Sequence, residues 1–96
     1  MEIGTAIKSL RKQKGLGQKQ LAEMCDISVN ALSQIETNVS FPQKATIRKI
    51  CEAFNIPVAY LLVLSMTDED VAEDKKVTFN YLNDALKTVL LDNLNK

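Results

Sequence analysis

The chain has 96 residues, of which 46% are hydrophobic and 25% are charged, as in one small soluble domain with a modest core. Twelve Lys and Arg balance twelve Asp and Glu, and a net charge of zero argues at first against a nucleic-acid binder, because such domains are usually basic. There is no His, the commonest general base and zinc ligand, and two cysteines cannot build a disulfide scaffold or a four-thiolate metal site. We therefore expect a protein that is not an enzyme and that holds no metal or cofactor.

The chain shows no pattern of export or membrane insertion. Residues Met1 to Thr5 contain no apolar run of the kind that signal peptides have. The longest apolar run, Val58 to Leu64, is far too short to span a bilayer. We expect a protein of the cytoplasm.

Apolar residues recur with helical period between the glycines and prolines of the first 64 residues, and no alternating strand pattern appears among them. Helices are predicted over about residues 2–14, 17–24, 28–37 and 43–54, followed by a short fifth helix that Pro57 opens. Gly15, Asp26 and Asn55 stand where left-handed backbone is expected, and Ser28 is the predicted N-cap of the third helix. The predicted core residues are Ile3, Ala6, Ile7, Leu10, Leu21, Ala22, Cys25, Ala31, Leu32, Ile35, Ile47, Ile50, Cys51, Phe54, Val58, Leu61 and Leu62.

A change of composition at Ser65 marks a C-terminal extension, residues 65–96, which follows a first domain of residues 1–64. Thr67 precedes three acidic residues and is the predicted cap of a helix, since acids favour the first helical turn. From Leu82 onward the apolar spacing is helical, whereas the β-branched stretch 77–79 leaves open a short strand or a kink. The sequence therefore predicts an all-α fold, a five-helix bundle with a helical C-terminal extension.

Two short helices joined by a turn of about three residues occupy residues 18–36, between the first helix and two more. This stretch resembles the helix-turn-helix of the XRE family, the phage-repressor-like DNA-binding domains, and the resemblance extends over about residues 3–62. It rests on Arg-x-x-x-Gly-Leu at 11–16, Gln-x-x-Leu-Ala at 18–22, Ile-Ser at 27–28, Ile-Glu at 35–36, Pro42, Ile-x-x-Ile at 47–50 and Leu-Leu at 61–62. The resemblance implies a repressor-like bundle that binds double-stranded DNA with its third helix.

Three positions depart from the pattern of the family. Gly17 replaces the usual Ser or Thr that caps the second helix, and Asp26 and Asn38 replace glycines. Asp and Asn tolerate left-handed backbone, so the fold is expected to survive these changes. The third helix also has no Lys or Arg between Ser28 and Asn38, which excludes a bidentate arginine–guanine contact from it. The sequence therefore predicts an A/T-leaning half-site under this helix.

The outward face of the third helix carries short side chains that can reach base edges in a major groove. The predicted base-reading residues are Val29, Asn30, Ser33 and Gln34. Asn and Gln amides can pair with the edge of adenine, and the valine can pack on a thymine methyl group. The plain alternative is that all four are solvated helix residues.

Phosphate contacts are expected at two places. The free N–H groups at the start of the second helix form an anion site, and the resemblance implies contacts from Gln18 and from the loop after the third helix. The candidates are Gln18, Lys19, Ser28, Thr37, Asn38 and Lys44. The resemblance also implies an ion pair between Arg11 and Glu36, which would brace the third helix against the first.

The extension carries an apolar stripe that either folds back on the bundle or meets its twin in a second subunit. The candidate dimer-interface residues are Phe79, Leu82, Leu86, Val89, Leu90 and Leu94. Because repressor-like domains generally bind two-fold symmetric sites as dimers, we expect a homodimeric repressor with a palindromic operator. The alternative is an antitoxin whose extension binds a toxin protein.

The neutral total hides an uneven distribution of charge. Residues 1–64 carry eight Lys or Arg and five Asp or Glu, a balance of +3, whereas residues 65–96 carry four and seven, a balance of −3. The sequence is therefore compatible with DNA binding by a mildly basic bundle whose acidic extension faces away from the phosphates.

Overall fold

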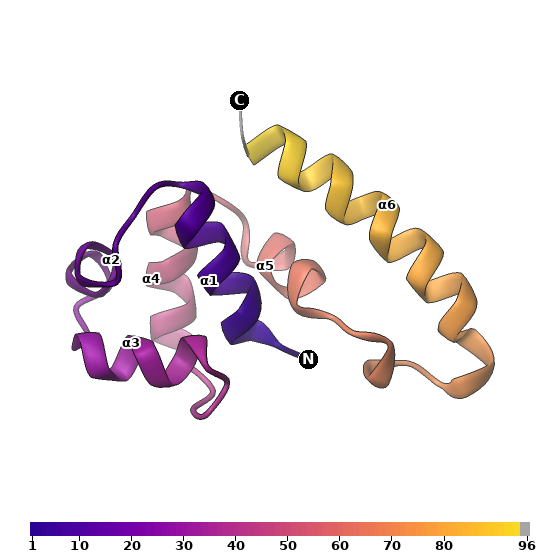
Figure 1. Cartoon of the computed structure of the whole chain (residues 1–96), viewed down its shortest axis with the longest axis horizontal. Coiled ribbons are helices and arrows are strands. Elements are labelled where there is room, and N and C mark those ends of the chain that lie inside the picture. Colours follow the sequence, from indigo (N-terminus) through magenta and orange to yellow (C-terminus); the bar gives the residue numbers. More distant parts are fainter. Residues whose placement is uncertain (95–96) are drawn as a thin grey trace.

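The computed structural model describes the backbone of residues 1–94 and the side chains of residues 1–89. It contains α1 (Ile3–Gln13), α2 (Gln18–Met24), α3 (Val29–Glu36), α4 (Lys44–Phe54), α5 (Val58–Ser65) and α6 (Lys76–Leu94), with two 3₁₀ turns, Asp68–Asp70 and Glu73–Lys75, between the last two helices. No strand occurs among the residues described. The predicted all-α fold is confirmed: α1 to α5 form one bundle, and α6 lies beside it (Figure 1).

The core of the bundle follows the helical period of the sequence. The buried apolar side chains are Ile3, Ala6, Ile7, Leu10, Leu21, Ala22, Cys25, Leu32, Ile35, Ile50, Cys51, Phe54, Ile56 and Leu61. Both cysteines are free thiols inside this core, and burial raises the pKa of each of them. Because a buried thiol with a raised pKa forms little thiolate, the cysteines act as small core residues.

The prediction that Val58 and Leu62 close the core is wrong. Helix α5 is apolar on all sides but turns only one side inward, that of Leu61 and Ser65. Val58 is therefore 39% exposed and Leu62 is 36% exposed. The two side chains line an open cavity of about 460 Å³ together with Phe41, Pro42, Lys44, Ile47 and Arg48.

The turns between the helices are formed where the sequence predicts them. Gly15, Asp26 and Asn55 adopt positive φ angles of 71°, 61° and 56°. The Ser28 hydroxyl accepts a hydrogen bond of 3.0 Å from the backbone N–H of Ala31, as expected for the N-cap of α3. These local features set the directions in which α2 and α3 leave their turns.

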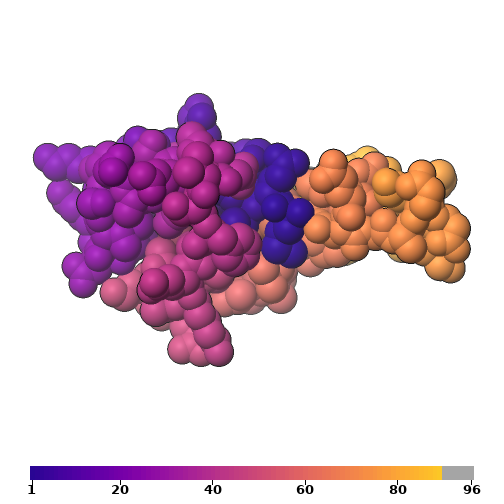
Figure 2. Space-filling view, turned by 90° about the horizontal axis from the view of Figure 1, so that it is seen from below, coloured from indigo at the N-terminus to yellow at the C-terminus, as the bar shows by residue number. Residues whose placement is uncertain are grey.

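The extension differs from its prediction in two respects. Residues 77–79 belong to α6, so the short strand that their β-branching left open does not form. Thr67 opens a single 3₁₀ turn rather than a helix, and its N–H donates to the Asp70 carboxylate at 2.8 Å. That hydrogen bond, together with the N-terminal ammonium group 2.9 Å away, lowers the pKa of Asp70. The extension forms a lobe at one end of the molecule (Figure 2).

None of the described helices combines the length and the apolar character needed to cross a bilayer.

Candidate nucleic-acid interface

Helices α2 and α3 and the turn between them form a helix-turn-helix. Leu21 of α2 and Leu32 of α3 are fully buried and fix the two helices against the core. The left-handed Asp26 makes the turn, and the N–H of Ile27 donates to the carbonyl of Ala22 at 3.0 Å. Because its apolar side is held inward, α3 presents its opposite side to solvent.

The exposed side of α3 contains the residues predicted to read bases. Val29, Asn30 and Gln34 are exposed, whereas Ser33 is half-buried. The Gln34 side-chain oxygen accepts a hydrogen bond of 3.3 Å from Ser40. The outward face of α3 is thus uncharged and combines amides with one branched apolar side chain. These are the groups that match adenine edges and thymine methyl groups.

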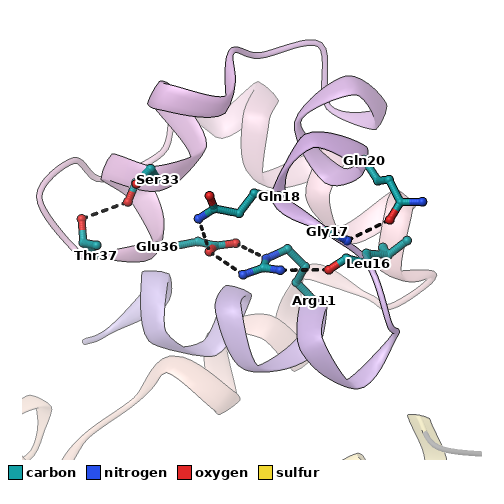
Figure 3. A network of polar contacts seen from close by, with 8 residues as sticks. All are labelled: Arg11, Leu16, Gly17, Gln18, Gln20, Ser33, Glu36 and Thr37. Carbon is teal, nitrogen blue, oxygen red and sulfur yellow. Dashed lines mark hydrogen bonds and ion pairs between the residues drawn. The ribbon is translucent and has the colours of Figure 1, made fainter.

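The residues predicted to contact phosphates differ in whether their side chains already make hydrogen bonds or ion pairs within the chain. Lys19 and Lys44 are exposed, and neither forms an ion pair among the residues described. The side chain of Gln18 donates instead to Glu36 at 3.0 Å, so at this position the backbone N–H is the group left for an anion. The Ser28 hydroxyl oxygen caps α3, and the Thr37 hydroxyl donates to the carbonyl of Ser33 at 2.9 Å (Figure 3).

Arg11 of α1 and Glu36, the last residue of α3, form a bidentate ion pair behind the helix-turn-helix (Figure 3). The Nε–Oε2 and Nη2–Oε1 distances are 2.7 and 3.1 Å, and the side chains are 9% and 1% exposed. The guanidinium also donates to the Leu16 carbonyl at 2.9 Å, and Gln18 adds a third hydrogen bond to the carboxylate. One buried network therefore connects α1, α2 and α3.

Gly4 and Thr5, near the start of α1, were not predicted as site residues, yet they hold the residue that follows α3. The N–H of Gly4 donates to the Asn38 side-chain oxygen at 2.9 Å, and the Asn38 amide donates to the Thr5 hydroxyl at 2.9 Å. Asn38, predicted to contact phosphate, thus has both ends of its amide engaged within the chain. The sequence feature that could have indicated this contact is Gly4, an isolated glycine inside a helical pattern, because such a glycine often marks close packing.

Helix α6 turns Phe79, Asn83 and Lys87 toward the bundle and leaves apolar side chains exposed on another side. Asn83 is buried and Lys87 is half-buried, whereas Leu82, Leu86 and Val89 are 54%, 50% and 57% exposed. Val77 and Tyr81 are also exposed, at 85% and 77%. Phe79 is half-buried and so differs from the other candidate dimer residues, and the side chains of Leu90 and Leu94 lie outside the described part of the chain.

A family model described as helix-turn-helix matches residues 7–61, more than half of the chain. The chain belongs to the XRE-type helix-turn-helix family. Members of this family are DNA-binding transcription regulators, and the resemblance predicted from the sequence is confirmed. In this XRE-type chain the matched residues span α2, the turn and α3.

Three curated relatives of this XRE-type chain show how far the similarity extends. It is 42% identical over 55 residues to the HTH-type transcriptional regulator SutR of Escherichia coli, which is 57% of this chain and 31% of that protein. It is 29% identical over 80 residues to the Immunity repressor protein of Bacillus phage phi105, covering 83% and 53% of the two chains. It is 43% identical over 54 residues to Antitoxin PezA of Streptococcus pneumoniae, covering 56% and 34%. The matches span about a third to a half of the length of these relatives. No solved structure matches the chain significantly.

Proposed function

We propose that this chain is a sequence-specific repressor that binds double-stranded DNA as a homodimer and reads an A/T-leaning palindromic operator with α3. Val29, Asn30, Ser33 and Gln34 face the bases in the major groove. The start of α2, the residues after α3 other than Asn38, and the lysines beside them contact phosphates. The chain performs no catalysis and acts in the cytoplasm, where its DNA is.

The observation that carries this proposal is that α3 presents an uncharged amide face to solvent while its other side is held rigidly. On that other side, Arg11, Glu36 and Gln18 tie α3 to α1 and α2. A rigidly held helix with an uncharged amide face suits direct readout, since each hydrogen bond to a base edge requires placement to a fraction of an ångström. With no Lys or Arg on α3, the amides favour adenine.

Selection of binding sites from random DNA tests this proposal. The expected product is a palindrome with A/T-rich half-sites about one helical turn apart, bound by two chains per duplex in native mass spectrometry. Asn30→Ala is expected to weaken binding to that duplex about 10-fold or more and to relax base preference at one position, because a bidentate contact is lost. Asn80→Ala, an exposed asparagine on α6, is the matched control and leaves affinity unchanged. A guanine-dominated core, or equal affinity of Asn30→Ala and wild type, contradicts the proposed readout.

The exposed face of α6 supports the homodimer. A helix that leaves Leu82, Leu86 and Val89 about half exposed along one side has apolar surface available for another molecule. A second copy presents the same stripe, and two such stripes pack against each other across a two-fold axis. A palindromic operator needs that symmetry, and joining two bundles multiplies the modest affinity of one.

Leu86→Lys is expected to convert the dimer to a monomer, because it places a charge in the middle of the paired stripes. Analytical ultracentrifugation measures the mass, and a titration with operator DNA measures the accompanying fall in affinity. Asn80→Lys adds the same charge at an exposed position on a different face of α6 and is expected to stay dimeric. If Leu86→Lys keeps the dimer mass and operator affinity of wild type, α6 is not the dimer interface.

The second candidate is an antitoxin, favoured by the 43% identity to Antitoxin PezA over 54 residues. In that case α3 binds DNA as above, and the apolar face of α6 covers a toxin protein rather than a second copy. A small toxin-like reading frame beside this one, and a stable complex of the two products on co-expression, would favour this function. Loss of that complex in Leu86→Lys would place the contact on α6.

A further inference from the structure

The first turn of α1 has backbone N–H groups without partners inside the helix, as every helix does. Glu2, at the N-cap position, provides no side-chain cap for them. Asn38, 34 residues away in the sequence, provides one: its Oδ1 accepts the N–H of Gly4 at 2.9 Å. Asn38 follows α3 in left-handed backbone with φ of 63°, which turns its side chain back toward α1. The end of α3 therefore caps the start of α1.

The other end of the same amide makes a second hydrogen bond. The Asn38 Nδ2 donates to the Thr5 hydroxyl at 2.9 Å, and that hydroxyl donates onward to a Glu2 carboxylate oxygen at 3.4 Å. Close backbone contact accompanies these bonds, because a Cβ on Gly4 would lie 1.9 Å from the Ile35 carbonyl oxygen. We call Gly4, Thr5 and Asn38 the α1–α3 clamp.

We propose that Asn38 is a positioning residue for base readout, which acts through the α1–α3 clamp rather than by contact with DNA. Together, the clamp and the Arg11–Glu36 ion pair hold the end of α3 at two places on α1. Those places are separated by about 10 Å, from Gly4 to Arg11, at the helical rise of about 1.5 Å per residue. Attachment at two separated places on α1 restricts the tilt of α3 along α1 as well as the position of its end.

The direction of α3 matters because the base-reading residues begin at its far end. The helix is about 12 Å long, so a tilt of about 10° about its C-terminal end displaces Val29 by about 2 Å. A hydrogen bond to a base edge tolerates only about 0.5 Å of displacement. Loss of the clamp is therefore expected to weaken specific readout without removing any group that touches DNA.

The test rests on the proposed function, since it uses the duplex selected with the wild-type protein. Asn38→Gly keeps left-handed backbone accessible and removes the amide. Thr5→Val removes only the hydroxyl and remains β-branched, whereas Thr5→Ser keeps the hydroxyl and is the matched control. Circular dichroism identifies a temperature at which every variant is fully folded, so that affinity is compared between folded proteins.

The expected result has three parts. Asn38→Gly and Thr5→Val each weaken binding to the selected duplex about 3- to 10-fold, the range of one or two ordinary hydrogen bonds, and Thr5→Ser binds like wild type. Binding to a scrambled duplex and its salt dependence stay unchanged, because phosphate contacts are retained. The double variant Thr5→Val/Asn38→Gly binds no more weakly than Asn38→Gly alone, because both changes remove the same hydrogen bond.

Two outcomes overturn the proposal. If Asn38→Gly weakens binding to both the selected and the scrambled duplex while Thr5→Val leaves both affinities unchanged, Asn38 contacts DNA directly. If both variants bind the selected duplex like wild type, the clamp does not position α3. Hydrogen exchange separates this failure from failure of the proposed function. If the Gly4 N–H is protected from exchange in the wild-type protein and loses that protection in Asn38→Gly, the clamp exists. A wild-type protein that selects no duplex then overturns the DNA-binding function, and the positioning role with it.

Discussion

Gly4→Ala is expected to lower the free energy of unfolding by about 2 kcal/mol or more, the range for forcing extra volume into a packed contact. The added Cβ would lie 1.9 Å from the Ile35 carbonyl oxygen and 2.7 Å from the Asn38 side-chain oxygen. The closer atom belongs to the backbone of α3, so the two helices must move apart. Alanine has the better intrinsic helix propensity by about 1 kcal/mol, and the contact must outweigh that gain.

Urea denaturation measures this effect, with a lower midpoint and an unchanged slope as the expected result. Gly17→Ala is the matched control, because a Cβ at that position meets only the Gln20 side-chain oxygen, at 3.7 Å. Its φ of −77° is accessible to alanine, and exchanging glycine at an N-cap is expected to cost less than about 1 kcal/mol. Equal midpoints for wild type and Gly4→Ala would show that α1 and α3 do not approach each other this closely.

Arg11→Met is expected to destabilise the bundle by about 3–5 kcal/mol, the usual result of removing one partner of a buried ion pair. The Glu36 side chain is 1% exposed, and without the guanidinium its charge keeps only the hydrogen bond from Gln18. Glu36→Leu leaves the positive charge of Arg11 buried without its partner and is expected to destabilise the bundle by a similar amount. Methionine keeps much of the apolar stem of arginine, so the lost charge dominates the comparison.

The double variant Arg11→Met/Glu36→Leu separates stability from positioning. Its thermal midpoint is expected to lie well above those of both single variants, because no unpaired charge is left in the core. Its affinity for the operator is expected to stay below that of wild type, since the link from α1 through Glu36 to Gln18 is gone. Wild-type melting temperature and operator affinity in Arg11→Met would rule out the brace.

The distribution of charge acquires a physical meaning in the structure. The described part of the acidic extension, with α6 and the turns before it, forms a lobe at one end of the molecule (Figure 2). The helix-turn-helix belongs to the mildly basic bundle at the other end (Figure 1). A net charge of zero is thus compatible with the proposed DNA binding, because the field at a surface depends on nearby charges more than on the total.

The local elements of this protein could be predicted from its sequence alone. Gly15 and Asp26 form left-handed turns, and Ser28 caps α3, because each of these outcomes depends on the residue and its immediate neighbours. The buried faces of α1 to α4 follow from apolar residues at helical spacing. The outward face of α3 follows in the same way, as the side opposite to Leu32 and Ile35.

Tertiary structure decided what depends on contacts between distant segments. Helix α5 is apolar all round, so no periodicity could show that Val58 and Leu62 would stay exposed. The amide of Asn38 is equally suited to a phosphate or to a helix terminus, and only the approach of α1 across 33 residues of sequence gives it Thr5 as a partner. The conformation of a turn or a helix cap depends on neighbouring residues and can be predicted from them. The hydrogen-bond partner of a side chain such as Asn38 depends on how distant helices pack.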